Sequence, residues 1–209
     1  MTESVARERF DEAYAGGTAP WVIGEPQPAV VALERDGLIR GRVLDAGCGT
    51  GEHTILLTEL GYDVLGIDFS PGAVELARRN AEHRGVAARF EVADALAPGG
   101  EPRFDTVLDS ALFHVFDDAD RVRYLRALHG ICLPGAVLHV LALSDVEPGI
   151  GPRISEATVR APFGDGWELA DLRTGRYRGM VRPEEGRRLG LPADEPADFL
   201  AWLARGERR

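Results

Sequence analysis

Lysine is missing from this sequence, because all 24 basic residues are arginine. Without lysine the chain has no P-loop of the G-K-[ST] type, no Schiff-base residue and no lysine general base. Side-chain amides are almost as scarce, since Asn80 is the only asparagine and Gln27 the only glutamine. These gaps exclude several common modes of phosphate binding and covalent catalysis.

Cysteines and long apolar runs are also scarce. Cys48 and Cys132 are the only cysteines, too few for a disulfide framework or a metal cluster. No apolar run approaches the roughly 20 residues that span a bilayer. The start, MTESVARERFDEAY, is too polar for a signal peptide. We therefore expect a reduced, cytoplasmic protein that binds no metal and has no membrane span.

Clusters of positive charge are absent too. The chain carries 34 acidic against 24 basic residues, a formal net charge of −10, and shows no basic block. Nucleic acid and anionic membranes would repel such a chain. We expect neither as a partner. The oligomeric state stays open between monomer and homodimer.

Short apolar runs alternate with helical patterns from residue 41 onward. The predicted strands are 43–46, 63–67, 88–92, 104–109 and 136–143, and the predicted helices between them are 53–60, 71–84 and 120–132. This alternation is typical of βαβ units in a mostly parallel, doubly wound sheet. Residues 1–40 are predicted to be a helical lead-in with a Pro/Gly-punctuated segment and a short helix. Because no linker or repeat interrupts the chain, we expect one domain over 1–209.

The pattern changes after Trp167. Residues 167–179 are predicted to be a strand, and 199–209 either a last strand or a short helix. Two consecutive strands without a full crossover helix form an antiparallel pair. The fold predicted is therefore α/β and Rossmann-like, a seven-stranded sheet with an antiparallel edge hairpin.

The glycine-rich stretch VLDAGCGTGEHT, 43–54, follows the first strand directly. Ligands bind near this point in doubly wound sheets. Gly47, Gly49 and Gly51, with Cys48 between them, predict a loop that a ligand approaches closely. A dinucleotide fingerprint would need a glycine where Glu52 stands, and a carboxylate there repels pyrophosphate.

Three acids end three successive predicted strands: Asp45, Asp68 and Asp94. Asp45 is placed to attract a ligand amine. Asp68 is placed to accept both ribose hydroxyls, and Asp94, with Ala95 and Leu96, suits the adenine ring. An amine, a ribose and an adenine without phosphate describe S-adenosylmethionine. The alternative is a structural glycine turn among unrelated surface acids.

With these motifs, the sequence resembles the class I S-adenosylmethionine-dependent methyltransferases over 43–143. The stretches PWVIGEPQP, 20–28, and FDTVLDSALFHVFDDADRVRYL, 104–125, resemble more narrowly the thiopurine methyltransferase-like bacterial enzymes. The resemblance implies in-line methyl transfer to O, S or N of a small, aromatic or heterocyclic molecule.

The same resemblance implies an N-terminal lid, 1–40, that folds over the cofactor and brings Trp21 beside the sulfonium. Val22 departs from the subgroup, which has an acid there. Ordinary packing is the alternative for Trp21. The segment 179–196 matches no pattern of the family.

The remaining site candidates follow the fourth predicted strand. His114 is either a general base or a histidine that bonds backbone and lines the pocket. Arg121 either lies near the substrate or forms a surface ion pair. The family carries (D/N)-P-P-(Y/F) here when it methylates amines and amides, and this chain does not. Further candidates are Asp109 for cofactor binding and catalysis, Phe69 for the cofactor, and Phe113 and Phe116 as substrate walls.

Two other functions remain open from the sequence. One is a non-catalytic module that binds S-adenosylmethionine. The other is an NAD(P)-dependent oxidoreductase on a similar sheet, which Glu52 and the absence of a Tyr/Lys pair oppose.

Overall fold

A seven-stranded sheet forms the centre of the computed structural model, which describes residues 7–209, with strand order β3-β2-β1-β4-β5-β7-β6. The strands are β1 (Arg42–Ala46), β2 (Asp63–Asp68), β3 (Arg89–Val92), β4 (Phe104–Ser110), β5 (Cys132–Leu143), β6 (Trp167–Met180) and β7 (Pro196–Arg208). The first five are parallel, and β7 lies antiparallel between β5 and β6. This confirms the predicted fold class, and the strand order reverses between β1 and β4.

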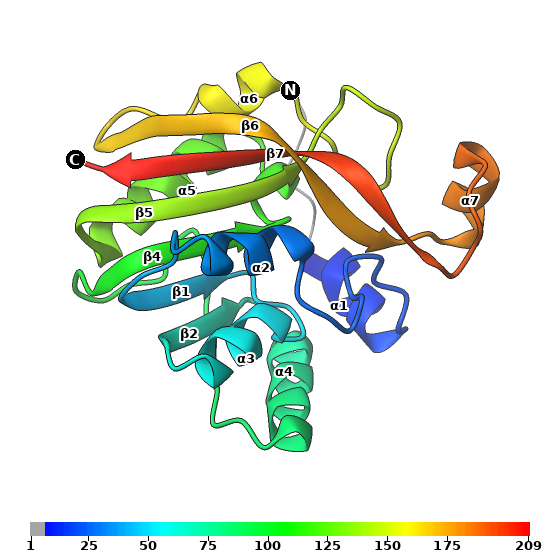
Figure 1. The fold of residues 1–209 in the computed structure, drawn as a ribbon, viewed down its shortest axis with the longest axis horizontal. Coiled ribbons are helices and arrows are strands. Elements are labelled where there is room, and N and C mark those ends of the chain that lie inside the picture. The colour runs from blue at the N-terminus through cyan, green and yellow to red at the C-terminus, as the bar shows by residue number, and fades with distance from the viewer. Residues whose placement is uncertain (1–6) are drawn as a thin grey trace.

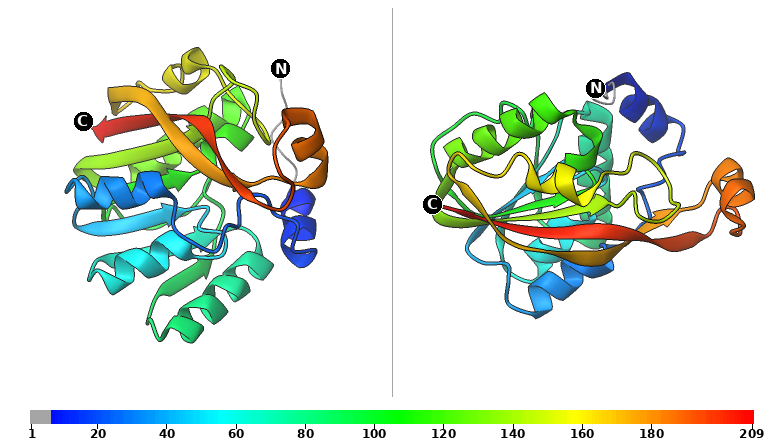
Figure 2. Two further views of the ribbon diagram at one scale, coloured as in Figure 1. Left: turned by 45° about the vertical axis from the view of Figure 1, so that its right-hand side comes forward. Right: turned by 90° about the horizontal axis from the view of Figure 1, so that it is seen from above.

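The helices cover both faces of the sheet, and α2 and α5 lie on opposite sides of it (Figure 2, right). They are α1 (Arg7–Ala15), α2 (Pro28–Arg35), α3 (Glu52–Glu59), α4 (Pro71–Arg84), α5 (Asp118–Ile131), α6 (Glu156–Arg160) and α7 (Pro183–Leu189), with a 3₁₀ turn, η1 (Phe113–Val115). One apolar cluster packs beneath α5, and a second joins α2 and α3 to the other face. Burial on both faces agrees with the mostly buried strands β1, β2 and β4, whereas the edge strand β3 is largely exposed.

The caps of the helices follow from sequence. Ser70 Oγ accepts from Ala73 N at the start of α4, and Gly85 ends that helix with φ 69°. Asp117 caps α5 in the same way through Asp120 N, so this helix begins two residues before the predicted start. These two caps fix where α4 and α5 begin, after β2 and β4.

The C-terminal stretch 199–209 resolves to a strand rather than a helix. It forms most of β7, which pairs with both β5 and β6. Between β6 and β7 the chain makes an excursion over 181–195 that contains α7 and projects beyond the sheet (Figure 1). None of the helices in residues 7–209 has the length and apolarity needed to cross a bilayer.

Candidate active site

A cavity of about 900 Å³ opens at the carboxyl ends of the parallel strands. Small-molecule pockets range over about 300–1,000 Å³, so this one lies near the upper end of that range. We call it the main cavity. A second cavity of about 40 Å³, the loop cavity, lies beside the glycine loop. Four residues line both: Trp21, Gly47, Ser110 and Tyr177.

Asp68 ends β2 and lines the main cavity. Its Oδ2 accepts from Gly49 N at 3.0 Å, and its Oδ1 accepts from Ser70 N at 2.9 Å. Burial raises the pKa of this carboxyl, whereas the two backbone N–H groups lower it. Each carboxylate oxygen has a further lone pair, so the fixed carboxylate can accept two more hydrogen bonds from a ligand diol.

Asp94, Ala95 and Leu96 line the main cavity beyond β3, together with Phe69. Asp94 Oδ1 accepts from Leu96 N at 2.9 Å, which folds this short turn back on itself. A flat ring fits against the small and apolar side chains here, next to a carboxylate that can accept from an exocyclic amine.

The three glycines of the loop are required for different structural reasons. Gly47, Gly49 and Gly51 all have positive φ, at 71°, 54° and 88°. Gly47 and Gly49 line cavities, but a Cβ on Gly51 would lie within 3.0 Å of Phe90 and Ala77. Gly51 is therefore required by packing between α3, α4 and β3, and not by direct approach of a ligand.

Two predicted contact residues, Asp45 and Asp109, lie behind the cavity walls and line neither cavity. Asp45 is 1% exposed, accepts from Thr54 Oγ1 at 2.7 Å and faces His53 Nδ1 at 3.9 Å. Asp109 Oδ1 accepts from Leu112 N at 3.1 Å and from the next backbone N–H at 3.0 Å. Their side-chain positions support roles in shaping the loop and η1, not direct contact with a ligand.

Some of the predicted site residues after β4 line the main cavity, and others are buried in the core. Phe116 and His114 line the main cavity, whereas Phe113 is fully buried beneath α5 and does not line it. Arg121 is also buried: its guanidinium lies 5.7 Å from the Phe113 ring centroid and pairs with Asp118 at 2.7 Å. Phe113 and Arg121 therefore support η1 from behind, and neither lines the main cavity; Arg121 forms the ion pair that was its alternative, from a buried position with an exposed Asp118.

His114 is held by the backbone of β5. Its Nδ1 accepts from Leu143 N at 3.1 Å, and the imidazole is only 6% exposed. Burial, with the positive charge of Arg121, lowers the pKa of His114 to about 3. Of the two alternatives left by the sequence, this geometry favours a histidine that bonds backbone and lines the pocket.

An aromatic cluster from the N-terminal segment covers the main cavity. The Trp21 ring centroid lies 5.3 Å from that of Phe10 and 5.7 Å from that of Tyr14, and Trp21 Nε1 donates to Tyr14 Oη at 2.9 Å. Phe10 in turn contacts Phe69 edge-on, with centroids 5.5 Å apart. Trp21 packs in this cluster and also lines both cavities. Ordinary packing and a place in the site are therefore both true of Trp21.

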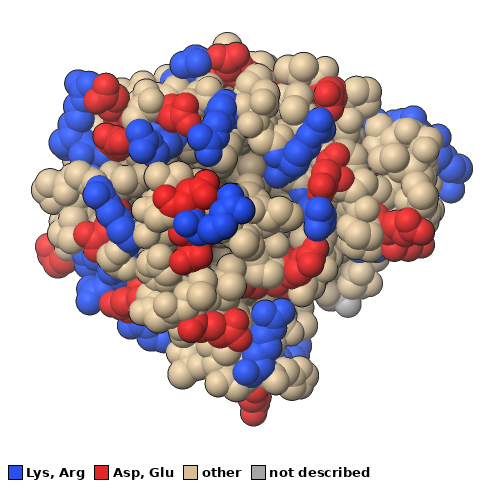
Figure 3. Space-filling view, in the orientation of Figure 1, with Lys and Arg blue, Asp and Glu red and all other residues tan. Residues whose placement is uncertain are grey.

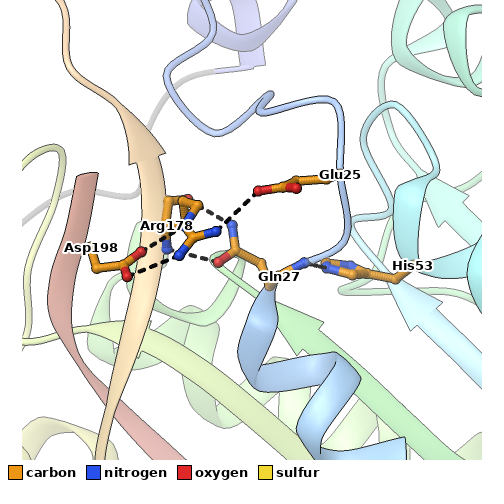
Figure 4. A network of polar contacts seen from close by, with 5 residues as sticks. All are labelled: Glu25, Gln27, His53, Arg178 and Asp198. Atoms are coloured by element: carbon orange, nitrogen blue, oxygen red, sulfur yellow. Dashed lines mark hydrogen bonds and ion pairs between the residues drawn. The ribbon is translucent and has the colours of Figure 1, made fainter. Parts of the chain in front are cut away.

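A polar network fastens the segment after Trp21 to the sheet (Figure 4). Gln27 Nε2 donates to Arg178 O at 2.7 Å and Gln27 Oε1 accepts from Arg178 N at 2.8 Å, so one side chain satisfies a backbone pair of β6. Gln27 N donates to His53 Nε2 at 3.1 Å. The Arg178 guanidinium pairs with Asp198 and Glu25. The only glutamine of the chain thus ties the lid segment to the sheet.

Several residues that line the main cavity were not predicted from the sequence. Tyr177 comes from β6, Tyr14 from α1, and Arg182 and Glu184 from the 181–195 excursion. Local signals for α7 are present: Pro183 opens it, acids occupy its first turn, arginines its last, and Gly190 follows. Nothing local shows that this helix reaches the cavity, because that depends on β6 pairing with β7.

Comparison with known proteins agrees with this geometry. Residues 43–135 match the family described as a methyltransferase domain. The chain is 34% identical over 189 residues to the 2-heptyl-1-hydroxyquinolin-4(1H)-one methyltransferase of Mycobacteroides abscessus, covering 84% of this chain and 83% of that protein. It is 34% identical over 175 residues to the ubiquinone biosynthesis O-methyltransferase of Methylocella silvestris, covering 83% of this chain and 64% of that one.

Among solved structures, the chain superposes with a TM-score of 0.85 and 42% identity on a protein studied for the conversion of a disulfide bond into a thioacetal group during echinomycin biosynthesis. The match covers 96% of this chain and 92% of the other. This likeness extends beyond the sheet to nearly the whole chain. The chain belongs to the class I S-adenosylmethionine-dependent methyltransferases that act on small molecules.

Proposed function

We propose that the chain methylates O, S or N of a compact, planar acceptor enclosed between η1, the aromatic lid and α7. One observation carries this proposal: a single cavity runs from the carboxylates at the ends of β2 and β3 to an apolar chamber. The chamber is lined by Leu112, Val115, Phe116, Leu143 and Ile150. Such walls suit a flat apolar molecule.

The residues fit the cofactor in three parts. Asp68 accepts from the ribose hydroxyls, and Asp94 with Leu96 and Phe69 holds the adenine. The backbone of Gly47 and Gly49, beside the loop cavity, is the place for the amino-acid half. S-adenosylmethionine, when bound, supplies a methyl group already activated on a sulfonium.

The chain's own contribution is position and exclusion of water. Good orientation supplies roughly 7–11 kcal/mol of the barrier. Trp21, Gly47, Ser110 and Tyr177 line both cavities, so methyl transfer is placed among them. A cation over the Trp21 ring gains up to about 2 kcal/mol where water is excluded. Catalytic metal is not part of the proposal.

The surface charge bears on which class of acceptor the chain can take. On the face seen in Figure 3, arginines and acids are interspersed rather than gathered by sign. With a net charge of −10, this leaves nucleic acid an unsuited acceptor. The narrower thiopurine methyltransferase-like subgroup, a cytoplasmic location and the choice between monomer and homodimer stay predictions.

A methyl-transfer panel tests the function. The wild-type chain is incubated with S-adenosylmethionine and, separately, 2-heptyl-1-hydroxyquinolin-4(1H)-one, a hydroxyquinoline, an aryl thiol and an azaheterocycle. We expect S-adenosylhomocysteine and a methylated product from at least one of them. The 2-heptyl compound, named for the Mycobacteroides abscessus relative, is the first choice. Cofactor binding without product from all four classes would contradict the proposal.

A further inference from the structure

His114 has a fixed hydrogen-bonding direction inside the acceptor chamber. Its Nδ1 accepts from Leu143 N at 3.1 Å, and a ring nitrogen that accepts from an N–H carries no proton. The neutral ring therefore carries its proton on Nε2. Since His114 lines the main cavity and its Nδ1 is bound to the backbone, the ring nitrogen left for a ligand there is an N–H donor, not a free acceptor.

The surroundings of His114 keep the ring neutral. Burial and the Arg121 guanidinium, which lies behind η1 on α5, lower the pKa of His114 to about 3. From α5, Asp120 also lines the cavity, but it pairs with Arg123 at 2.6 Å. From β6, Tyr177 lines the chamber, and burial raises the pKa of its phenol so that it too stays neutral.

The other charges around the main cavity belong to other parts of it. Asp68 and Asp94 lie at the cofactor end, where Asp68 already accepts two backbone N–H groups. Charged residues of the 181–195 excursion close the chamber from α7: Arg182, Glu184, Glu185 and Arg187. Arg182 is turned toward the lid carbonyls of Gly17, Thr18 and Ala19. Within the described residues, His114 is thus the ionisable side chain on η1 itself.

A donor-only His114 cannot remove a proton from the acceptor. Its Nε2 is already protonated, and taking a second proton would make an imidazolium far more acidic than a phenol or thiol. The same N–H does favour a charged oxygen or sulfur, because a hydrogen bond to the ionised form lowers the pKa of the group that receives it.

We propose that His114 donates Nε2–H to the acceptor, and that the enzyme selects acceptors whose hydroxyl, N-hydroxyl or thiol is ionised before methyl transfer. This inference rests on the proposed function. In the step itself, a lone pair of the acceptor anion forms the bond to the methyl carbon. The carbon–sulfur bond breaks, its electron pair neutralises the sulfonium, and no proton moves to the protein.

The first test needs no turnover. The ring nitrogens of His114 are observed by ¹⁵N NMR in the chain without acceptor, assigned by loss of the signals in His114→Asn. We expect the Nε2–H tautomer, unchanged from pH 5.5 to 8.5. A ring protonated on Nδ1, or one that titrates within this range, would overturn the proposal, whatever the outcome of the methyl-transfer panel.

The second test uses a matched pair of variants. His114→Asn places an amide oxygen near Nδ1, where it can still accept from Leu143 N, but removes the donor. His114→Gln places an amide N–H near Nε2 and retains it. We expect kcat/KM to fall about 10–100-fold in the Asn variant, as for loss of a hydrogen bond to a charged group, and less in the Gln variant. Thermal unfolding controls for folding.

The pH dependence separates a donor from a base. Across acceptors of different acidity, the rising limb of kcat/KM should follow the pKa of each acceptor, in wild type and in His114→Asn alike. An enzyme pKa that is shared by all acceptors and vanishes in His114→Asn or Asp120→Asn would show a protein base and overturn the inference. Absence of product from every acceptor would instead count against the proposed function.

Discussion

At the residue scale, Asp109 lies at the end of β4 directly behind the cavity wall. Its Oδ1 accepts from the N–H groups of Leu112 and Phe113, which starts η1, while its Oδ2 has no hydrogen-bond partner within residues 7–209. The Tyr124 hydroxyl is buried beside it on α5. Burial raises the pKa of Asp109 to about 7, although the N–H groups oppose this. The folded chain therefore binds a proton here that an unfolded chain releases near pH 4.

The raised pKa of Asp109 makes the free energy of unfolding depend on pH in a defined direction. Because the folded pKa is raised, the favourable contribution of protonated Asp109 is complete below about pH 4 and is lost as pH rises through about 7. Replacing Asp109 with Asn keeps an oxygen for the two N–H groups and carries no charge. We expect the free energy of unfolding of Asp109→Asn, relative to wild type, to rise between pH 4 and 7 by up to roughly 1.4 kcal/mol per unit and then level off.

Denaturant unfolding at several pH values measures this. Asp165→Asn is the control, because the Asp165 side chain is 91% exposed and pairs only distantly, at 3.9 Å, with Arg126. The free energy of unfolding of Asp165→Asn, plotted against pH, should run parallel to that of wild type. A parallel curve for Asp109→Asn as well would contradict a raised pKa at this carboxyl.

The sequence predicted which residues lie at the strand ends, but not which of their side chains reach the cavity, since Asp45 and Asp109 line neither cavity. Asp68 and Asp94 line the main cavity because the carboxyl ends of parallel strands meet at one edge, which the strand pattern alone implies. Phe113 and His114 are neighbours in one turn, yet only His114 faces the cavity. The 3₁₀ turn η1 sets the directions of these two side chains, and no periodic pattern in the sequence predicts them.

At the element scale, the lid and the 181–195 excursion are fastened together by Arg182. Its Nε donates to Thr18 O at 3.0 Å, and its Nη2 donates to Gly17 O and Ala19 O at 3.3 and 3.2 Å. Met180 N also donates to Pro20 O at 2.8 Å. Elements from the two ends of the chain therefore form one roof over the cavity. Both α1 and α7 contribute lining residues, and the two helices lie at the same end of the molecule (Figure 1).

Replacing Arg182 should loosen this roof. In Arg182→Gln we expect faster backbone hydrogen exchange over residues 10–20, because three carbonyls lose their partner, with little change in the sheet. We also expect weaker cofactor and acceptor binding, each by several-fold. Hydrogen exchange with mass spectrometry measures the first effect.

The control for the roof lies on β6, the strand that leads into the 181–195 excursion. Arg173 on β6 is exposed and pairs with Asp171 at 3.5 Å, so Arg173→Gln should leave exchange over 10–20 unchanged. Equal exchange in Arg182→Gln and wild type would show that Arg182 does not hold the lid.

The sheet was predictable at this scale and the roof was not. Alternation of strands and helices predicts β1 to β5, and the change after Trp167 predicts the β6–β7 hairpin. The roof depends instead on contacts such as Gln27 with Arg178, about 150 positions along the chain. Local pattern carries no information about such pairs, so the place of α7 over the acceptor chamber emerges only with the fold.

At the scale of the whole molecule, the main cavity has a cofactor end and an acceptor end. The cofactor end is polar and fixed by backbone hydrogen bonds to Asp68. The acceptor end is apolar and closed by elements that are far apart in sequence. Family membership fixes the cofactor. The shape of the acceptor chamber and the His114 side chain determine which acceptor is methylated.

Calorimetry of cofactor binding tests this division most directly. The wild-type chain is titrated with S-adenosylhomocysteine and with NAD, and Asp68→Ala is titrated with S-adenosylhomocysteine under the same conditions. Glu91→Ala on β3, an exposed residue outside both cavities, is the matched control.

Wild type and Glu91→Ala should bind S-adenosylhomocysteine equally, and wild type should not bind NAD. Asp68→Ala should bind at least 10-fold more weakly, since hydrogen bonds to a charged group contribute about 1.5–3 kcal/mol each. Undiminished binding by a folded Asp68→Ala variant, or binding of NAD by wild type, would contradict the cofactor site at the carboxyl ends of β2 and β3.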